Sequence, residues 1–294
     1  MSLSNGFLAQ TACIWEATAR KLGNIHPNAR FADMEYVDFL LSAAVLGREM
    51  DVEPVPRLGQ LILQAFSASH RVVGKNTNLG IVLLLAPLAA LFSDAPSHDD
   101  RRSELRGALA ALTQQDASYV YEAIRLASPG GLGKAPDQDV AEAPTVTLLE
   151  AMRLAADRDM VARQYANGFA DVFDFGVPAF LESFARFGCV EAAVIASQLQ
   201  WLATYPDSLI GRKNGQAVAE DVQLRATEVL GLGGLATPEG RRAGVALDAH
   251  LRSDGNKLNP GTTADLITAC LFVALRENKV VRSAPFRWQV QDWL

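Results

Sequence analysis

The sequence has 294 residues, 49% of them apolar, so the chain can bury a substantial core and disorder along its whole length is excluded. Its 27 basic and 33 acidic residues give a formal charge of −6, which excludes the basic footprint typical of nucleic-acid partners. Three widely separated cysteines predict neither a disulfide framework nor a paired metal motif, and they indicate a reducing, cytoplasmic location. The first ten residues lack the basic and apolar stretches of a secretory signal.

Apolar residues recur at helical spacing nearly throughout the chain, whereas the alternation typical of strands is nearly absent. Glycine and proline cluster between the periodic segments, so each cluster indicates a turn between helices. We therefore predict an all-α fold, a single multi-helix globular domain over residues 1–294. The predicted helices span residues 4–22, 34–49, 55–73, 79–93, 99–113, 116–127, 145–156, 158–174, 178–187, 190–204, 212–231, 239–253 and 263–277.

The segment 76–93 carries no charge and could be mistaken for a membrane span. Asn78, Gly80 and Pro87 interrupt it, and its apolar part is shorter than the roughly 20 residues that a bilayer core requires. The segment therefore predicts a buried central helix over residues 79–93 and no membrane partner.

Two other segments stand apart from the helical pattern. Residues 128–144 are rich in glycine and proline and longer than ordinary helix connections, so they predict a loop or lid. The C-terminal tail, residues 279–294, carries the scattered aromatic residues Phe286, Trp288 and Trp293. We expect this tail to pack on the body of the protein or on the partner subunit of a homodimer.

No standard catalytic signature occurs: the sequence has no P-loop, no HExxH, no GxSxG and no Cys/His ligand cluster. Instead, polar turns rich in Asn, Asp, Lys and Arg adjoin apolar helices. The first turn contains Lys21, Asn24 and His26, followed by Asp33 and Asp38. Helix capping at Asn24 and Asp33 is the structural alternative, but it does not explain why a cation, an amide and an imidazole share one turn.

The second turn contains Lys75, Asn76 and Asn78 and opens the uncharged segment. Asn78 could simply cap the helix that follows. The functional alternative uses the same geometry, because unpaired N–H groups and the positive end of the helix dipole form an anion site. Lys75 would add charge there, and Gly80 would let a ligand approach the backbone.

Two further clusters lie on predicted helices. On helix 158–174, four polar residues recur every fourth position and face either solvent or a cleft: Asp159, Arg163, Asn167 and Asp171. Arg212 and Lys213 open the predicted helix 212–231. Cations at a helix N-terminus oppose the dipole, so this placement costs stability unless an anion is bound nearby.

The last polar turn precedes the predicted helix 263–277 and contains Asn259 and Thr262. Thr262 and Asp265 have the spacing of a capping box, so a purely structural role is an alternative here. Asp248 and Arg252, on the preceding helix, have the spacing of an ion pair along one helical turn.

Taken together, these turns resemble the signature blocks of the triphosphoribosyl-dephospho-CoA synthase family, over roughly residues 15–277. LNPGTTADL and NTNLGIVLLLAPL are the most specific stretches. The matching blocks are KLGNIHPNARFADMEYVDFLLSA (21–43), GKNTNLGIVLLLAPLAAL (74–91), PGGLG (129–133), ADRDMVARQYANGFADVF (156–173), SLIGRKNG (208–215) and LRSDGNKLNPGTTADLITACLFVAL (251–275).

The resemblance implies an all-α enzyme that transfers the 5-triphosphoribosyl group of ATP to the ribose 2′-hydroxyl of dephospho-CoA and releases adenine. Members that serve citrate lyase typically read NTHKG where this chain has NTNLG, and carry a GARGEA-like motif where it has ADRDMVARQY. The sequence is similar instead to a divergent branch found in archaea and in bacteria with one-carbon metabolism. A related ATP- or phosphoribosyl-dependent step, such as one near tetrahydromethanopterin synthesis, and a non-catalytic helical nucleotide-binding protein remain the alternatives.

The residues of the turns suit the implied chemistry, which needs a base, a donor to the departing purine and cations for the triphosphate. Magnesium held by one or two carboxylates and phosphate oxygens would need no Cys or His ligand. We expect Asp33, Asp38 and Asp159 to act as catalytic carboxylates, with Asp33 and Asp159 binding Mg²⁺. The expected ATP- and acceptor-binding residues are Lys21, Asn24, His26, Lys75, Asn76, Asn78, Arg163, Arg212, Lys213, Asn259 and Thr262.

Overall fold

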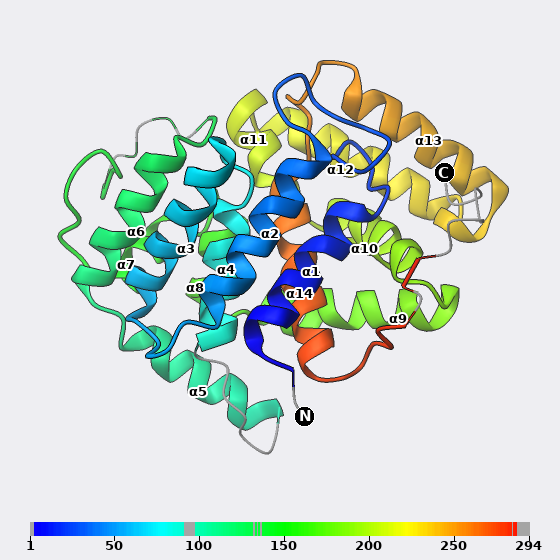
Figure 1. The fold of residues 1–294 in the computed structure, drawn as a ribbon. Coiled ribbons are helices and arrows are strands. Elements are labelled where there is room, and N and C mark those ends of the chain that lie inside the picture. The colour runs from blue at the N-terminus through cyan, green and yellow to red at the C-terminus, as the bar shows by residue number, and fades with distance from the viewer. Residues whose placement is uncertain are drawn as a thin grey trace.

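A computed structural model of the chain describes residues 3–90, 98–131, 133, 135, 137–283 and 285–286. This part of the chain contains no β-strand, only one isolated bridge between His26 and Ala29, so the predicted all-α domain is confirmed. Figure 1 shows the arrangement of its helices. They are α1 (Asn5–Thr18), α2 (Tyr36–Met50), α3 (Leu58–Val73), α4 (Leu79–Ala90), α5 (His98–Ala110), α6 (Gln114–Ala127), α7 (Leu148–Ala155), α8 (Met160–Asn167), the π-helix η1 (Asp171–Gly176), α9 (Val177–Phe187), α10 (Val190–Thr204), α11 (Ser208–Asn214), α12 (Gln216–Gly231), the 3₁₀ helix η2 (Gly234–Ala236), α13 (Pro238–Arg252) and α14 (Gly261–Arg276).

Two apolar helices, α4 and α14, form the centre of the molecule (Figure 1). In α4 every residue from Ile81 to Ala89 is buried, and in α14 every residue from Leu266 to Leu275 is buried. Helices that are apolar around their whole circumference need packing partners on every side. The predicted buried helix is thus confirmed as far as Ala90, and its last three predicted residues lie outside the described residues. Within the described ranges, no helix has the length and hydropathy needed to cross a membrane.

Pro87 interrupts the hydrogen-bond ladder of α4, because proline has no backbone N–H to donate to the carbonyl of Leu83 one turn earlier. The hydroxyl of Tyr165, on α8, donates a 2.7 Å hydrogen bond to that carbonyl. Burial raises the pKa of Tyr165, so the hydroxyl keeps the proton that it donates. This bond fixes α8 against α4 at the point where α4 lacks a bond of its own.

Two of the predicted helices are interrupted by glycine. The predicted helix 158–174 breaks where Gly168 and Phe169 have φ values of 67° and 62°, and a π-helical segment follows. The predicted helix 212–231 is two helices, because Gly215, with a φ of 95°, separates α11 from α12. Residues with side chains rarely adopt such φ values, and apolar periodicity does not reveal them.

The capping roles expected between the first two helices are wrong. α1 ends at Thr18, several residues before Asn24, so Asn24 lies in a loop rather than at a helix end. α2 begins after Glu35, whose backbone N–H donates a 2.9 Å hydrogen bond to the Asp38 carboxylate. Asp33 therefore does not cap α2, which leaves its carboxylate available for another role.

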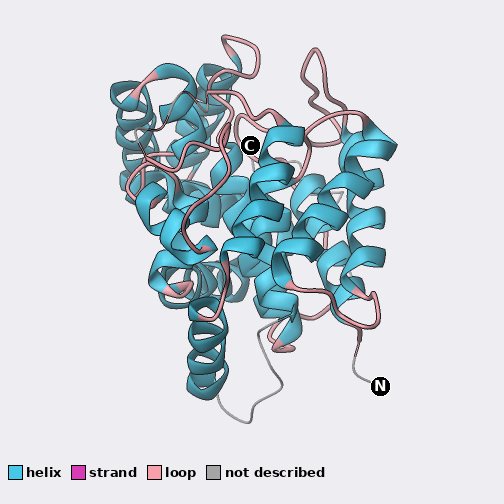
Figure 2. Ribbon diagram, turned by 90° about the vertical axis from the view of Figure 1, so that its left-hand side faces the viewer, coloured by secondary structure: helices cyan, strands magenta, loops and turns pink. Residues whose placement is uncertain are grey.

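Long loops collect at one end of the molecule. The loops from α1 to α2, from α6 to α7 and from α13 to α14 lie at the upper end of the helices in Figures 1 and 2. The predicted loop over residues 128–144 is part of the α6–α7 connection. Since three separate parts of the chain meet there, this end is the natural place for a site.

The C-terminal tail packs on the body as far as it is described. The backbone N–H of Val190 donates a 2.9 Å hydrogen bond to the Pro285 carbonyl, and Phe286 packs against the main core. Trp288 and Trp293 lie outside the described residues.

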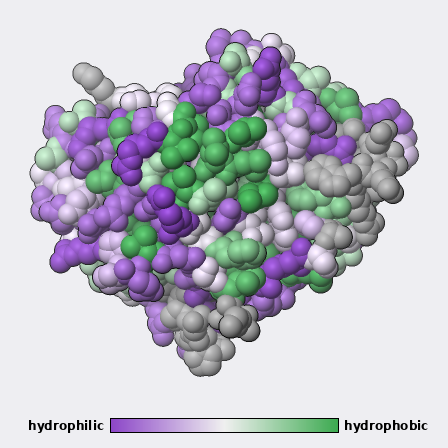
Figure 3. All heavy atoms as spheres, in the orientation of Figure 1, coloured by the Kyte–Doolittle hydropathy of each residue, from purple (hydrophilic) through white to green (hydrophobic). Residues whose placement is uncertain are grey.

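On the face shown in Figure 3, apolar side chains gather over α2, where Val37 and Leu41 are exposed. The homodimer stays a prediction.

Candidate active site

A cavity of about 660 Å³ opens at the end of the molecule where the long loops meet. Its walls come from all three loops and from α4, α6, α7, α8, α11 and α14. Residues far apart in the sequence therefore share one site. The predicted site residues that line it are Asn24, Asp33, Lys75, Asn76, Asn78, Asp159, Arg212, Lys213, Asn259 and Thr262.

Three helices, α4, α8 and α14, present their N-terminal ends to the cavity. The Asn76 side chain accepts the backbone N–H of Leu79 at 3.2 Å. The Asp159 carboxylate caps α8 by accepting the N–H groups of Val161 and Ala162 at 2.8 and 3.2 Å. Helix N-termini carry partial positive charge, so their convergence favours an anionic ligand.

Arg212 and Lys213 lie in the last turn of α11, which corrects their expected position at a helix N-terminus. Cations there interact favourably with the dipole, so the predicted cost to the ligand-free helix does not arise. The Arg212 guanidinium forms an ion pair with Asp159. Lys213 Nζ is 3.4 Å from the carbonyl oxygen of Asn256, and it has no carboxylate partner among the described residues. Burial lowers the pKa of Lys213, with the charge of Asp33 acting in the opposite direction.

Two amide side chains in the lining have an unused acceptor. Asn78 is 5% exposed, and its Nδ2 donates to Ser69 at 3.1 Å while its Oδ1 has no partner in the described part of the chain. Asn259 Oδ1 is also buried and has no hydrogen-bond partner in the described part of the chain. A buried acceptor without a partner costs about 1–3 kcal/mol, so both positions favour a ligand that donates hydrogen bonds.

The opposite wall of the cavity is apolar and belongs to α4, α6 and α7. The loop after α6 lies directly against α11, because a Cβ on Gly131 would lie 2.6 Å from the Arg212 carbonyl oxygen. Gly131, with a φ of 75°, thus allows a close approach that a larger residue would prevent. The apolar lining residues include Leu83, Val120, Ile124, Leu148 and Met152.

The family model for ATP:dephospho-CoA triphosphoribosyl transferase (CitG) matches residues 4–283, which is nearly the whole chain. The chain belongs to this family. A protein of Pseudomonas savastanoi pv. phaseolicola, described as "Probable 2-(5''-triphosphoribosyl)-3'-dephosphocoenzyme-A synthase", is 35% identical over 115 residues. A Pseudomonas putida protein of the same description is 35% identical over 113 residues. The matches span 39% and 38% of this chain and only 39% and 40% of those relatives.

A solved structure supports the fold of this transferase family. The crystal structure, from Archaeoglobus fulgidus, is described as a candidate triphosphoribosyl-dephospho-CoA synthase and is 29% identical to this chain. It superposes with a TM-score of 0.63 and covers 81% of this chain and 98% of its own. The likeness therefore extends over nearly the whole of that protein.

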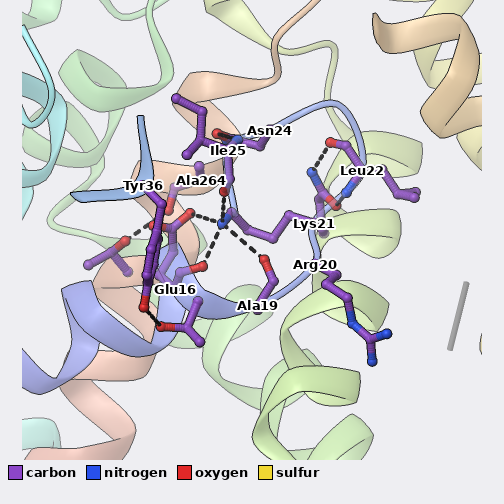
Figure 4. A network of polar contacts seen from close by, with 12 residues as sticks. Glu16, Ala19, Arg20, Lys21, Leu22, Asn24, Ile25, Tyr36 and Ala264 are labelled. Atoms are coloured by element: carbon purple, nitrogen blue, oxygen red, sulfur yellow. Dashed lines mark hydrogen bonds and ion pairs between the residues drawn. The ribbon is translucent and has the colours of Figure 1, made fainter. Parts of the chain in front are cut away.

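Lys21, which we expected to bind ligand, does not line the cavity. Its Nζ lies 3.0 Å from Glu16 Oε1 and donates to the Ile25 carbonyl at 3.3 Å, as Figure 4 shows. Lys21 is 1% exposed and the Glu16 side chain 5%. Burial lowers the pKa of Lys21 and raises that of Glu16, while their mutual attraction opposes both shifts. Lys21 therefore supports Glu16, whose side chain does line the cavity.

Arg163 was expected in the cleft beside Asp159, and this placement is wrong. Arg163 Nε and Nη2 bind the Asp171 carboxylate at 2.8 and 3.2 Å, and the guanidinium stacks over the Tyr205 ring. Gln164 and Asn167 donate to the same carboxylate. Of the predicted polar stripe, Asp159 therefore lines the cavity, whereas Arg163, Asn167 and Asp171 form a separate network outside the lining.

His26 and Asp38 also lie outside the cavity lining. Burial, with help from Arg252 and Lys21, lowers the pKa of His26 to about 4, so its imidazole is neutral at pH 7 and offers no charge to phosphate. Asp38 binds Lys75 at 2.8 Å, and although burial opposes it, this bond helps to hold its pKa below the usual value. Asp38 therefore positions Lys75 at the cavity edge.

Glu16 and Asp265 line the cavity but were not predicted as site residues, and the same holds for Asp137 and Asp139 of the α6–α7 loop. The expected capping box of Thr262 and Asp265 is wrong, because α14 begins at Gly261 and both residues lie inside the helix. A signal was present: Asp265 is the one charged residue between Gly261 and Leu275. A lone charge in a helix apolar enough to be buried needs either a partner or a ligand.

Proposed function

We propose that this chain transfers the triphosphoribosyl group of ATP to the ribose 2′-hydroxyl of dephospho-CoA, with release of adenine. The observation that carries the proposal is the convergence of three helix N-termini, Lys75, Arg212 and Lys213 on one cavity. In this reaction the hydroxyl oxygen bonds to the anomeric carbon of the donor, and the bond from that carbon to adenine breaks. The family membership supports the same reaction.

The polar wall suits the triphosphate. Triphosphate carries four negative charges, and a site for it needs several cations and N–H donors at once. Lys213 provides a half-buried charge without a carboxylate partner, and Arg212 lies beside it. The N-termini of α4, α8 and α14 add backbone N–H groups whose dipoles favour the same anion.

Magnesium fits this site only as an ion that arrives with the triphosphate. Among the described residues, no group of three or more His, Cys, Asp or Glu side chains could hold a metal ion. Asp159 was expected as a ligand, but its two oxygens already accept two N–H groups and the Arg212 guanidinium. Asp33 lines the cavity, has no hydrogen-bond or ion-pair partner in the part of the chain that is described, and would hold Mg²⁺ together with phosphate oxygens. The ion would neutralise charge on the triphosphate.

The apolar wall suits the uncharged parts of the two substrates. The adenine ring and the organic arm of dephospho-CoA both need apolar surface, which α6 and α7 supply through residues such as Val120 and Met152. The α6–α7 loop lines the same side, so we propose that it acts as a lid over the bound acceptor.

The decisive experiment incubates the purified protein with Mg-ATP and dephospho-CoA and follows adenine release and the mass of the product. Release of adenine with a product whose mass is that of ATP plus dephospho-CoA less one adenine supports the proposal. Adenine release only with a pterin-type acceptor would replace dephospho-CoA by another acceptor. No Mg-ATP binding by calorimetry would favour a non-catalytic helical protein.

A matched pair of lysine variants tests the triphosphate site. Lys213→Met should weaken Mg-ATP binding by about 1.5–3 kcal/mol, the usual value of a hydrogen bond to a charged group. Lys257→Met is the control, because Lys257 is 60% exposed, pairs with Asp254 and lies outside the cavity lining. Equal affinities for the two variants in calorimetry would show that the triphosphate binds elsewhere.

A further inference from the structure

Asp265 is placed differently from the other carboxylates around the cavity. Its side chain faces the cavity from α14, near the N-terminal end of that helix. It lies against the backbone of α4, because a Cβ on Gly80 would be 2.0 Å from Asp265 Oδ2. Glycine at position 80 therefore makes room for the carboxyl group.

The neighbouring carboxylates all have hydrogen-bond or ion-pair partners, whereas Asp265 has none among the described residues. Glu16 pairs with Lys21, and Asp159 pairs with Arg212. Asp207 accepts the backbone N–H and the hydroxyl of Thr263, both at 2.8 Å. Asp265 has no hydrogen-bond or ion-pair partner in the described part of the chain. It is thus free to form its hydrogen bond with a ligand.

The charges around Asp265 favour its protonated form. Burial raises its pKa well above the usual value, and the negative charges of Glu16, Asp207 and Asp159 raise it further. Arg212 acts in the opposite direction but is already paired with Asp159. α4 contributes no charged residue, and the remaining titratable neighbour, Cys13 of α1, is a thiol whose pKa is raised by its own burial. These surroundings favour the form of the carboxyl group that has a proton to donate.

We propose that Asp265 is the acid that protonates adenine as it leaves the ribose. This inference rests on the proposed transfer reaction. The electron pair of the breaking bond between the anomeric carbon and the ring nitrogen stays with the purine, and the Asp265 proton goes to a purine ring nitrogen. The acceptor hydroxyl forms the new bond and releases its proton to solvent, from which Asp265 is reprotonated. Adenine then leaves as a neutral molecule instead of an anion.

The experiment compares two leaving groups. With ATP and dephospho-CoA, Asp265→Asn should release adenine about 100-fold or more slowly than wild type, the usual contribution of a general acid. With the 5′-triphosphate of nicotinamide riboside as donor, the base leaves neutral and takes up no proton. Asp265→Asn should therefore remain within about tenfold of wild type with that donor. Asp221→Asn, on the surface of α12, is the matched control and should behave as wild type with both donors.

Two further readouts separate an acid from a structural group. Infrared difference spectroscopy at neutral pH should show a protonated carboxyl band that disappears in Asp265→Asn. Gly80→Ala keeps the carboxyl but displaces it, so it should lower the rate with ATP more than the rate with the nicotinamide donor.

The outcomes are distinct. An active wild type with an equally active Asp265→Asn variant overturns the role of Asp265, and so does an equal loss with both donors or an ionised carboxyl in the spectrum. A wild type that releases no adenine from ATP overturns the proposed function, and the acid role falls with it.

Discussion

Asp171, which is buried, and Asp265, which is partly buried, are carboxyl groups in opposite surroundings. Asp171 accepts hydrogen bonds from Arg163, Gln164 and Asn167, and these donors outweigh burial and hold its pKa below the usual value. Asp265 has no donor among the described residues, and burial together with neighbouring carboxylates raises its pKa. The first group is held by partners from the protein, and the second lines the cavity in surroundings that favour its protonated form.

The number of polar residues in a segment therefore does not tell a structural residue from a ligand-binding one. What distinguishes them is whether each polar group already has a partner within the protein. A group whose partners all come from the protein has little left to offer a ligand. Unpaired groups cost stability in the absence of a ligand, so they persist where a ligand compensates for that cost. Asn78 and Asn259 fit the same rule.

The largest effect should come from the most completely paired group, Lys21. Lys21→Met removes the cation and leaves the Glu16 carboxylate buried without a partner, so the free energy of unfolding should fall by about 3–5 kcal/mol. The double variant Lys21→Met with Glu16→Gln should recover part of this loss, because the charge is removed as well. Urea denaturation monitored by circular dichroism gives both values. A loss below about 1 kcal/mol would show that the pair is not an anchor.

Asp171 tests the comparison more directly. Asp171→Ala leaves the Gln164 and Asn167 amides and the Arg163 guanidinium without their common acceptor, so unfolding should become easier by about 2–3 kcal/mol. Because Asp171 lies outside the cavity lining, Mg-ATP affinity of the folded variant should not change. Asp157→Ala, at an exposed position, is the control and should stay within about 0.5 kcal/mol of wild type. Weakened Mg-ATP binding by an Arg163→Gln variant would show that the Asp171 network takes part in ligand binding, which would contradict its contrast with Asp265.

The smallest effect should be on the pH dependence of folding stability, to which Asp265 and Asp171 contribute with opposite signs. The folded state holds the Asp265 proton more tightly than the unfolded chain does, so stability is lost as pH rises above about 4, the pKa of an unfolded Asp. Asp171 has a lowered pKa, so its contribution is present above about 4 and is lost as pH falls. Relative to wild type, Asp265→Asn should therefore gain stability as pH increases, and Asp171→Asn should lose it. Melting temperatures from pH 4 to pH 8 distinguish these trends, and parallel curves would contradict them.

The fold class and the polar turns could be predicted because they depend on local information. Helical periodicity is visible over a single helix, and turns that combine Asn, Gly and Lys are visible within a few residues. The breaks at Gly168 and Gly215 could not be predicted, since a single φ value decides each of them. Because the break at Gly215 was not foreseen, Arg212 was predicted at the N-terminal end of a helix, whereas it lies in the last turn of α11.

Membership of the cavity was harder to predict, because it depends on where side chains point after folding. Asp159 and Arg163 are one helical turn apart, yet Asp159 lines the cavity while Arg163 turns to Asp171. Lys21 was misplaced because its partner Glu16 lies on α1, in a stretch that the sequence analysis did not single out. Asp265 was given a capping role that its local spacing allows and the start of α14 excludes.

The hydrogen bond from Tyr165 to the Leu83 carbonyl also bears on how the family varies. Without Pro87, a backbone N–H would compete for that carbonyl, and without the carbonyl the tyrosine hydroxyl would be buried unpaired. Each residue therefore compensates for the other, and we expect loss of either one alone to cost stability. We expect the two positions to be inherited as a pair, so that relatives without proline at position 87 carry phenylalanine at position 165. Independent variation of positions 87 and 165 across an alignment of relatives would contradict this expectation.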